Sequence, residues 1–215
     1  MSNMKDKILI YGAGGLGREV LSLLRAHQMF EVIGFLDDSV RRGTEIKGLK
    51  VLGGEEVLQG FDGKVNVVLA FGDPVVKSMR AKRLDSRHLE YPAIVHPAAI
   101  LQDPDSIKLG NGCVIGAGSI LTTDIEVGEH TLININCTIG HDSKVGRCSS
   151  LMPGVNVAGE VVIGNEVLIG AGASLINRIV IGDRVTVGMG AVVIKDVHAG
   201  VVVAGVPARP LLRQG

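Results

Sequence analysis

The stretch "LGNGCVIGAGSILTTDIEVGEHTLININCTIGHDSKVG" (residues 109–146) repeats a pattern every six residues, and the pattern continues to residue 193. Each hexapeptide has one Leu, Ile or Val at a fixed position, and no repeat slips out of phase. An α-helix would instead space its apolar residues with a period near 3.6. The period of six predicts a parallel β-helix, in which each short strand pairs with the strands above and below it. The fifteen aliphatic positions are Leu109, Ile115, Leu121, Val127, Ile133, Ile139, Val145, Leu151, Val157, Ile163, Ile169, Leu175, Ile181, Val187 and Val193.

Small residues surround these aliphatic positions. Glycine directly follows nine of them, and we expect these glycines to lie at corners, where a positive φ would strain a side chain. A small or β-branched residue, such as Cys113 or Ser119, stands two positions before most of them. Burial of each aliphatic side chain contributes roughly 1.5–3 kcal/mol. The repeats can therefore form a continuous core, although aromatic residues make up only 3% of the chain.

The first ninety or so residues follow a different pattern. An apolar run at residues 8–11 leads into a G-x-G-x-x-G motif at residues 12–17 and then into helical spacing. A second apolar run ends at Asp37 and Asp38, about twenty residues after the glycines. This βαβ arrangement is typical of nucleotide binding, because glycines let the backbone approach a phosphate and a carboxylate accepts sugar hydroxyls. A third strand is predicted over residues 65–73, and a helix with a proline start over residues 74–88.

The chain divides within "EYPAIVHPAAI" (residues 90–100), which contains two prolines. We predict an α/β Rossmann-like half-domain over residues 1–92, and a β-helix domain with a C-terminal tail over residues 93–215. The glycine motif alone also fits an NAD-type oxidoreductase. A domain of about ninety residues is half of a dinucleotide fold, however, and it favours one nucleotide over two.

The composition excludes some classes of partner. Lys plus Arg and Asp plus Glu both number 22, so no net charge attracts nucleic acid or an anionic membrane. No apolar stretch is long enough for membrane insertion, and the N-terminus lacks the pattern of a signal peptide. The three cysteines lack metal-ligand spacing and fit free thiols in a reducing compartment. We therefore expect a cytoplasmic protein.

Six motifs occur in a characteristic order: "YGAGGLGREV", "FLDD", "AFGD", "VHPAA", "IGHD" and "AGVPARP". Together with the hexapeptide repeats, they make the chain resemble a family of bacterial sugar O- and N-acetyltransferases over essentially its whole length. The family includes the UDP-amino-sugar N-acetyltransferases of the bacillosamine pathway, the perosamine N-acetyltransferases and the sialic acid O-acetyltransferase-like proteins. The resemblance implies a left-handed β-helix, a homotrimer, acetyl-CoA as co-substrate and a nucleotide-linked amino-sugar, with UDP favoured, as acceptor.

The resemblance also implies which residues bind the two substrates. The N-terminal domain would hold the nucleotide-sugar through Gly12, Gly14, Gly15 and Leu16 at the phosphates, Asp37 and Asp38 at the base or ribose, and Gly72 close by. Acetyl-CoA would lie in a groove between neighbouring β-helices. Its positions correspond to Asn134, Ser150, Gly159, Ala171, Met189 and Arg209, with Pro207 beside the last. Many relatives have a second histidine where this chain has Ser150, so any contact of that imidazole with the thioester would be altered or lost.

His141 and Asp142 carry the predicted chemistry. The resemblance implies a general base followed by an acid, and the residue types fit these roles. Imidazole titrates near neutral pH and can take the proton that an amine loses when it attacks a thioester. A neighbouring carboxylate raises imidazole basicity and fixes its tautomer. A backbone N–H near the glycine-rich corner could stabilise the thioester oxygen, and direct attack without an acyl-enzyme is the simplest mechanism.

The remaining histidines have plainer interpretations. They are interpreted as helix-surface residues (His27, His88), a junction residue (His96), a turn residue (His198) and a surface residue of the coil (His130). A β-helix of the γ-carbonic anhydrase type binds zinc through three histidines, whereas the repeats here contain only His130 and His141, so no metal is expected. O-acetylation of a sialic acid or related sugar hydroxyl, and a non-catalytic sugar-nucleotide-binding protein, stay open as alternatives.

Overall fold

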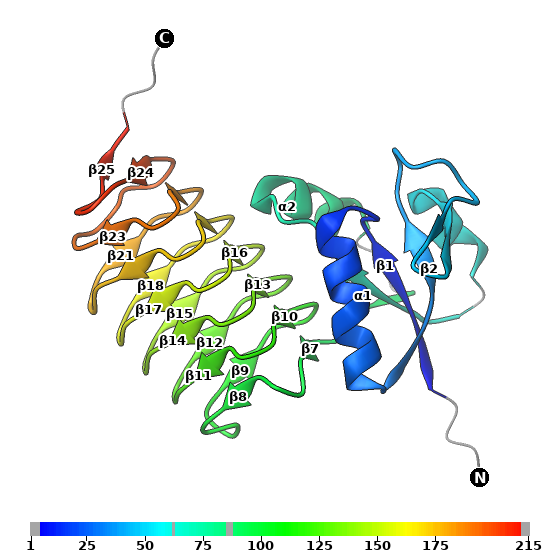
Figure 1. The fold of residues 1–215 in the computed structure, drawn as a ribbon, viewed down its shortest axis with the longest axis horizontal. Coiled ribbons are helices and arrows are strands. Elements are labelled where there is room, and N and C mark those ends of the chain that lie inside the picture. The colour runs from blue at the N-terminus through cyan, green and yellow to red at the C-terminus, as the bar shows by residue number, and fades with distance from the viewer. Residues whose placement is uncertain (1–4, 62, 85–87, 212–215) are drawn as a thin grey trace.

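The computed structural model describes residues 5–61, 63–84 and 88–211. Figure 1 shows an α/β domain followed by a long stack of triangular coils, with the helix α1 (Gly15–His27) lying between the sheet of the first part and the coils. In the described ranges no helix is both long enough and apolar enough to cross a bilayer.

The N-terminal domain contains a six-stranded sheet with the order β3-β4-β2-β1-β5-β6. Its central strand β1 pairs in parallel with β2 and β5, so the loops after these three strands meet at one edge. The elements are β1 (Asp6–Tyr11), β2 (Phe30–Leu36), β3 (Glu45–Ile46), β4 (Leu49–Gly53), the 3₁₀-helix η1 (Glu55–Gly60), β5 (Val65–Leu69), α2 (Pro74–Arg83) and β6 (Leu89–Glu90).

The helix predicted over residues 74–88 is shorter in the structure. Asp73 caps its N-terminus by accepting hydrogen bonds from the backbone N–H groups of Val75 and Val76, and the proline start is confirmed. The helix ends at Arg83, and residues 85–87 lie outside the described part of the chain. The prediction that His88 lies on a helix is therefore wrong, because this residue directly precedes β6.

The rest of the chain forms a parallel β-helix with three faces. Each strand pairs with the strand eighteen residues further along, as Val114 does with Leu132, and Leu132 with Ser150. The eight-stranded face contains β7 (Ile94–Val95), β10 (Val114–Ile115), β13 (Leu132–Ile133), β16 (Ser150–Leu151), β19 (Leu168–Ile169), β22 (Thr186–Val187), β24 (Val202–Ala204) and β25 (Arg209–Pro210). The six-stranded face contains β8 (Ile100–Leu101), β11 (Ile120–Leu121), β14 (Thr138–Ile139), β17 (Asn156–Val157), β20 (Ser174–Leu175) and β23 (Val192–Val193). The five-stranded face contains β9 (Lys108–Leu109), β12 (Glu126–Val127), β15 (Lys144–Val145), β18 (Val162–Ile163) and β21 (Val180–Ile181).

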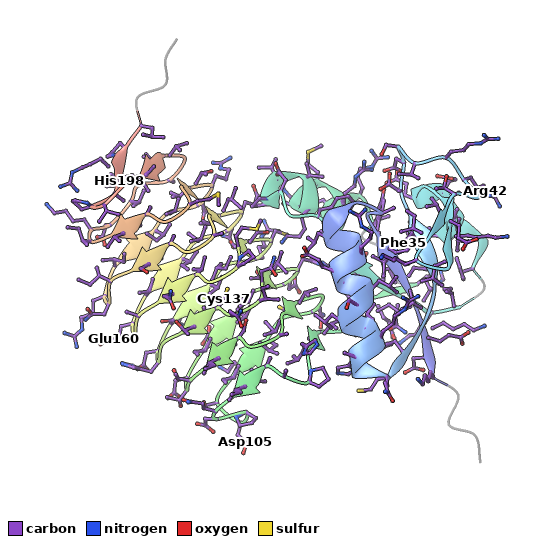
Figure 2. All side chains as sticks on the ribbon, viewed as in Figure 1. Phe35, Arg42, Asp105, Cys137, Glu160 and His198 are labelled. Carbon is purple, nitrogen blue, oxygen red and sulfur yellow. The ribbon has the colours of Figure 1, made fainter. Side chains whose placement is uncertain are left out.

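The predicted fold class is confirmed: an α/β domain precedes a left-handed parallel β-helix of hexapeptide repeats. Fourteen of the fifteen predicted aliphatic positions are buried, and Leu109 in the first coil is half-buried against the same core. Figure 2 shows Cys137 within the coils, whereas Glu160 projects from their outer edge.

The glycines that follow the aliphatic positions have a different role from the predicted one. Positive φ occurs two residues later in these corners, and residues other than glycine, such as Asn136 (φ 54) and Glu166 (φ 57), adopt it there. The glycine itself is needed because the next coil passes close to it. A Cβ at Gly110, for example, would lie 2.6 Å from the backbone nitrogen of Glu129. These positions require glycine because successive coils stack closely, and not because the backbone is left-handed there.

Small polar residues tie the first coils together. Ser119 Oγ donates to the Asn134 carbonyl at 2.7 Å, and Ser149 Oγ donates to the Gly164 carbonyl at 2.9 Å. The same bond to a carbonyl fifteen residues further along is made by Cys113, Thr131, Cys137 and Ser143. Burial raises the pKa of Cys113 and of Cys137 to about 11, so these thiols are structural donors and poor nucleophiles.

The N-terminal domain packs on the eight-stranded face. Val20 and Leu23 of α1 form one core cluster with Ile94, Val114 and Leu132, which occupy outward positions of that face. The chain passes from one sheet to the other between β6 and β7. The predicted boundary between residues 1–92 and 93–215 falls within this connection.

Candidate active site

His141 and Asp142 lie at an outer corner of the β-helix, directly after β14. The distance from His141 Nδ1 to Asp142 Oδ2 is 2.8 Å, and the two side chains are 56% and 59% exposed. Asp142 has a φ of 58, a left-handed conformation that Asp and Asn tolerate better than most residues. A carboxylate on Nδ1 favours the tautomer that leaves the Nε2 lone pair free. The pair therefore presents a proton acceptor on the outside of the coil.

Gly159 lies against the His141 imidazole, one coil further along. A Cβ at Gly159 would lie 2.5 Å from His141 Nε2 and 2.7 Å from Cε1. The backbone also joins the two coils here, because Glu160 N donates to the His141 carbonyl at 2.7 Å. Gly159, which the sequence analysis predicts at acetyl-CoA, thus also makes room for the imidazole.

Four of the six predicted acetyl-CoA residues, Asn134, Gly159, Ala171 and Met189, lie at two different corners. We call these the His141 corner (Thr123, His141, Gly159, Asn177 and Lys195) and the Met189 corner (Ala117, Ile135, Pro153, Ala171 and Met189), each with one residue per coil. The six-stranded face lies between them. Met189, which is 77% exposed, and Ala171 therefore do not share a groove with His141 within one chain. Asn134 is buried beside Ile135 at the Met189 corner.

The glycine motif has two kinds of position. Gly12 has a φ of 111, and a Cβ there would lie 2.8 Å from the Ala70 carbonyl oxygen, so the turn itself requires glycine. Gly17 packs tightly against Gly12. Gly14 faces open space and caps α1 without any side-chain hydrogen bond, and a Cβ at Gly15 would meet only Arg18 Nη2, at 4.0 Å. The backbone amides of the first helical turn are therefore available to an anion such as a phosphate.

Asp37 holds the glycine loop in place. Its Oδ2 accepts a hydrogen bond from Ala13 N at 2.8 Å, and its Oδ1 accepts from Ser39 and Val40. Burial acts to raise the pKa of Asp37, but these hydrogen bonds outweigh burial and the pKa is lowered. The carboxylate is thus occupied within the protein, and it orders the loop at the predicted phosphate site.

Asp38 takes part in a network at the same edge of the sheet. Its Oδ2 accepts from Tyr11 Oη at 2.7 Å and pairs with Arg80 Nη2 at 2.8 Å. Arg80 also pairs with Glu55 at 3.5 Å. Burial, followed by the hydrogen bond to Asp38, raises the pKa of Tyr11. Asp38 Oδ1 accepts from Glu55 N at 3.3 Å, and the side chain is still part-exposed (36%), so the carboxylate has room to accept one more hydrogen bond.

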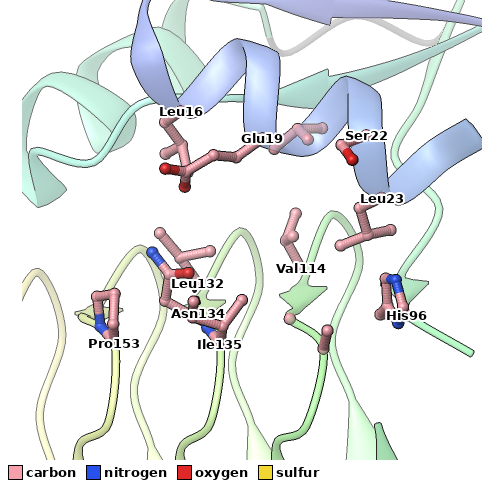
Figure 3. Close-up of a pocket in the computed structure, with 13 residues that line it drawn as sticks. Leu16, Glu19, Ser22, Leu23, His96, Val114, Leu132, Asn134, Ile135 and Pro153 are labelled. Atoms are coloured by element: carbon pink, nitrogen blue, oxygen red, sulfur yellow. Dashed lines mark hydrogen bonds between the residues drawn. The ribbon is translucent and has the colours of Figure 1, made fainter. Parts of the chain in front are cut away.

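A cavity of about 270 Å³ lies between α1 and the Met189 corner (Figure 3). Leu16, predicted at the phosphates, lines its helix side, and Asn134, predicted at acetyl-CoA, lines its coil side. Gly72 lies nearby, since a Cβ there would be 3.5 Å from Met152 Cε and 4.0 Å from Leu16 Cδ2. The structure thus brings residues predicted for each of the two substrates to one place.

Sequence reasoning missed three polar residues that line this cavity, Glu19, Ser22 and His96. Glu19 stands three residues after Leu16 in a helix, a spacing that places both side chains on one side, and this signal is visible in the sequence. His96 Nδ1 accepts a hydrogen bond from Ala98 N at 3.0 Å, so the ring proton of the neutral form is on Nε2. No pattern in the sequence brings His96 to α1.

Ser150 lies beneath α2 with no exposed surface. Lys77 Nζ donates to Ser150 Oγ at 2.8 Å and to the Ser149 carbonyl at 3.1 Å. Burial lowers the pKa of Lys77 to about 8. These bonds pin the N-terminal domain to the β-helix, and they leave Ser150 no surface for a direct contact with acetyl-CoA in this arrangement.

Arg209 lies in β25, which folds back on β24 at the end of the β-helix. A cavity of about 330 Å³ lies here, and Lys195, His198 and Arg209 are among its lining residues. Lys195 belongs to the His141 corner. The cavity that Arg209 lines therefore reaches the C-terminal end of the corner that carries His141.

His130 and His27 are more buried than predicted. The His130 ring packs edge-on against Tyr91 with centroids 4.7 Å apart, and burial lowers the pKa of His130 to about 4. His27 stacks on Phe30 with centroids 6.2 Å apart. Both side chains are half-buried beside an aromatic ring, and His27 lies on the predicted helix as its last residue. Across residues 5–61, 63–84 and 88–211, no cluster of three or more His, Cys, Asp or Glu side chains could hold a metal ion.

Both parts of the chain match known protein families. Residues 7–84 match the PglD N-terminal domain. Residues 160–195 match the bacterial transferase hexapeptide family (six repeats), and residues 100–123 match the hexapeptide repeat of succinyl-transferase.

Individual relatives align with most of the chain. It is 31% identical to GDP-perosamine N-acetyltransferase of Escherichia coli O157:H7 over 158 residues, which cover 71% of this chain and 70% of that protein. A solved variant of perosamine N-acetyltransferase from Caulobacter crescentus, in complex with CoA and GDP-perosamine, has a TM-score of 0.88 and 27% identity and covers 98% of this chain and 99% of that one. WeeI from Acinetobacter baumannii AYE has a TM-score of 0.86 and 30% identity, with 96% and 100% covered. The chain therefore belongs to the family of sugar N-acetyltransferases that includes GDP-perosamine N-acetyltransferase.

Proposed function

We propose that this protein transfers the acetyl group of acetyl-CoA to the amino group of a nucleotide-linked amino-sugar. The observation that carries the proposal is the exposed His141–Asp142 pair, held at a coil corner with room made for it by Gly159. The choice of these two substrates is supported by the Caulobacter relative, which was solved with CoA and GDP-perosamine.

In the proposed mechanism the amine attacks the thioester carbonyl directly. His141 Nε2 takes the proton that the nitrogen loses, and Asp142 holds Nδ1 so that Nε2 stays the acceptor. The new C–N bond forms as the C–S bond breaks, and the proton held by His141 passes to the leaving thiolate, so that CoA leaves as the thiol. General base catalysis of this kind contributes typically 10²–10⁴-fold to a rate.

The acceptor is proposed to bind along the first βαβ unit. Its diphosphate would lie at Gly14 and Gly15, where the helix amides are open, and its nucleoside near Asp38. A UDP-linked sugar, which the sequence favours, is one of several candidate acceptors. GDP-perosamine is the first acceptor to test, because the Caulobacter relative was solved in complex with it.

The proposed active site needs more than one copy of the chain. His141 lies at one corner, whereas Ala171, Met189 and the cavity beside Asn134 lie at another. A homotrimer, in which the His141 corner of one chain faces the Met189 corner of the next, would bring them together. Sedimentation equilibrium at micromolar concentration tests this: a fully active monomer would contradict it.

The function itself is tested by thiol release. Purified protein with acetyl-CoA should release CoA only when a GDP-, UDP-, dTDP- or CMP-linked amino-sugar is added, and the product should be an amide by mass spectrometry and hydroxylamine resistance. An ester on a sugar hydroxyl would favour O-acetylation. Binding of these sugars without thiol release would favour a binding protein, and tight NADH binding with none of these effects would favour an oxidoreductase.

A further inference from the structure

The cavity between α1 and the Met189 corner extends along the helix from its first turn. It begins at Leu16 and passes Glu19 and Leu23 (Figure 3). An α-helix rises 1.5 Å per residue, so Glu19 lies about 6 Å along the helix from Gly15, where the proposed diphosphate binds. A pyranose ring attached to that diphosphate therefore reaches Glu19.

The cavity walls carry a few polar groups over an apolar surface, namely those of Glu19, Ser22, His96 and Asn134. Glu19 supplies the single carboxylate among the described lining residues, and Figure 3 shows it directed into the gap above Asn134. Within the described part of the chain the Glu19 carboxylate has no hydrogen bond or ion pair. Asn134 Oδ1 is occupied by Ile135 N at 2.7 Å, which leaves the Nδ2 donor for the cavity. A few placed polar groups over apolar walls are typical of a small-molecule site, and they fit a sugar ring with a deoxygenated edge.

The chemistry of acetyl transfer restricts what Glu19 can bind. A carboxylate next to an ammonium group raises the pKa of that group, whereas attack on the thioester needs the neutral amine. A carboxylate in contact with the reacting amine would therefore slow the reaction. A hydroxyl on the same sugar has no such conflict, and a hydrogen bond from it to a carboxylate is strong because the acceptor is charged.

We propose that Glu19 is a positioning residue for the acceptor: its carboxylate accepts a hydrogen bond from a ring hydroxyl of the sugar and so turns the amine away from α1, toward the acetyl donor. The apolar side chains of the cavity contact the deoxygenated edge of the ring. This inference rests on the proposed function and adds the sugar subsite to it.

The test compares Glu19→Gln and Glu19→Ala with the wild type, using whichever of the GDP-, UDP-, dTDP- and CMP-linked 4-amino-sugars the wild type acetylates. Glu31→Gln is the matched control, because Glu31 is an exposed glutamate of the same domain outside the cavity. Glu19→Gln should raise KM for the sugar nucleotide about tenfold, the effect of losing one charge-assisted hydrogen bond. KM for acetyl-CoA, the Kd of the matching free nucleotide and the melting temperature should stay unchanged.

A second acceptor separates a hydroxyl contact from a general structural effect. With an analogue that lacks the ring hydroxyl, wild type and Glu19→Gln should show the same KM, because neither can form the bond. An unchanged KM for the acetylated acceptor in Glu19→Gln, or an equal loss of affinity for the free nucleotide, overturns this inference and leaves acetyl transfer standing. A wild type that acetylates none of the four acceptors overturns the proposed function and this inference with it.

Discussion

The imidazole of His141 lies against Gly159, the residue that occupies the same corner one coil later, and a Cβ there would be 2.5 Å from Nε2. Gly159 does not have a positive φ, so the backbone does not require glycine. The other residues at this corner, Thr123, Asn177 and Lys195, all carry side chains. The space that Gly159 leaves is therefore specific to the imidazole.

Gly159→Ala should move the His141 ring out of place. A displacement of about 1 Å can cost 10²-fold in rate, so we expect kcat to fall about 10- to 100-fold with little change in melting temperature. Gly60→Ala is the control, since Gly60 faces open space without a positive φ. Equal kcat values for Gly159→Ala and the wild type in the thiol-release assay would show that the ring position at Gly159 does not matter for the reaction.

His141→Ala should lower kcat by about 10²–10⁴-fold, because the proton acceptor is lost. The side chain is 56% exposed, so the free energy of unfolding should change by less than about 0.5 kcal/mol. The limb of the wild-type pH–rate profile that reports the proton acceptor should disappear in the variant. Denaturant titration and pH–rate profiles check both parts, and an unfolded variant or a retained rate would make His141 a structural residue.

Asp142→Asn should lower kcat less than His141→Ala does. The imidazole remains, but the carboxylate no longer holds its Nδ1 at 2.8 Å. Asparagine is the suitable replacement because residue 142 has a φ of 58, which Asn also tolerates, whereas Ala would add backbone strain. A loss of rate as large as that of His141→Ala would indicate that the carboxylate itself contacts a substrate.

His130 should make the protein less stable as the pH falls from about 6.5 to about 4. Burial lowers its pKa from 6.5 to about 4, so the unfolded chain binds more protons than the native state in this window. The free energy of unfolding should fall across it by roughly 2 kcal/mol because of this group, after allowance for its partial exposure. Urea unfolding at pH 7 and pH 4.5 should show a smaller difference in His130→Asn than in the wild type. His198→Asn, at an exposed histidine, should show the wild-type difference.

Lys77 should make the protein more stable as the pH rises from about 8 to about 10.5. Burial lowers its pKa from 10.5 to about 8, so unfolding takes up a proton in this range and the free energy of unfolding increases with pH. A shift of this size corresponds to roughly 3 kcal/mol. Lys77→Met should remove that part of the pH dependence, measured by urea unfolding at pH 8 and pH 10. The same slope in variant and wild type would mean that Lys77 is protonated in the native state throughout.

The sequence determined the β-helix because its order is local. Three hexapeptides make one coil, so each strand stacks on the strand eighteen residues away. Residues such as Ile115 and Ile133 are therefore paired and buried once the period is known. The glycine motif and the following Asp37 likewise predicted the first βαβ unit. The His141–Asp142 pair was visible because its members are adjacent in the chain.

The tertiary structure decided what depends on residues far apart in the sequence. Coil stacking, which brings residues eighteen positions apart into contact, set the steric role of Gly110 and put Gly159 against His141. Docking of α2 on the β-helix buried Ser150 beneath Lys77, 73 positions away, and docking of α1 made Glu19 and Asn134 neighbours across one cavity. These contacts depend on how the surfaces of the N-terminal domain and the β-helix fit together. The repeat period specifies which residues of the β-helix face outward, but it does not specify which part of the chain covers them.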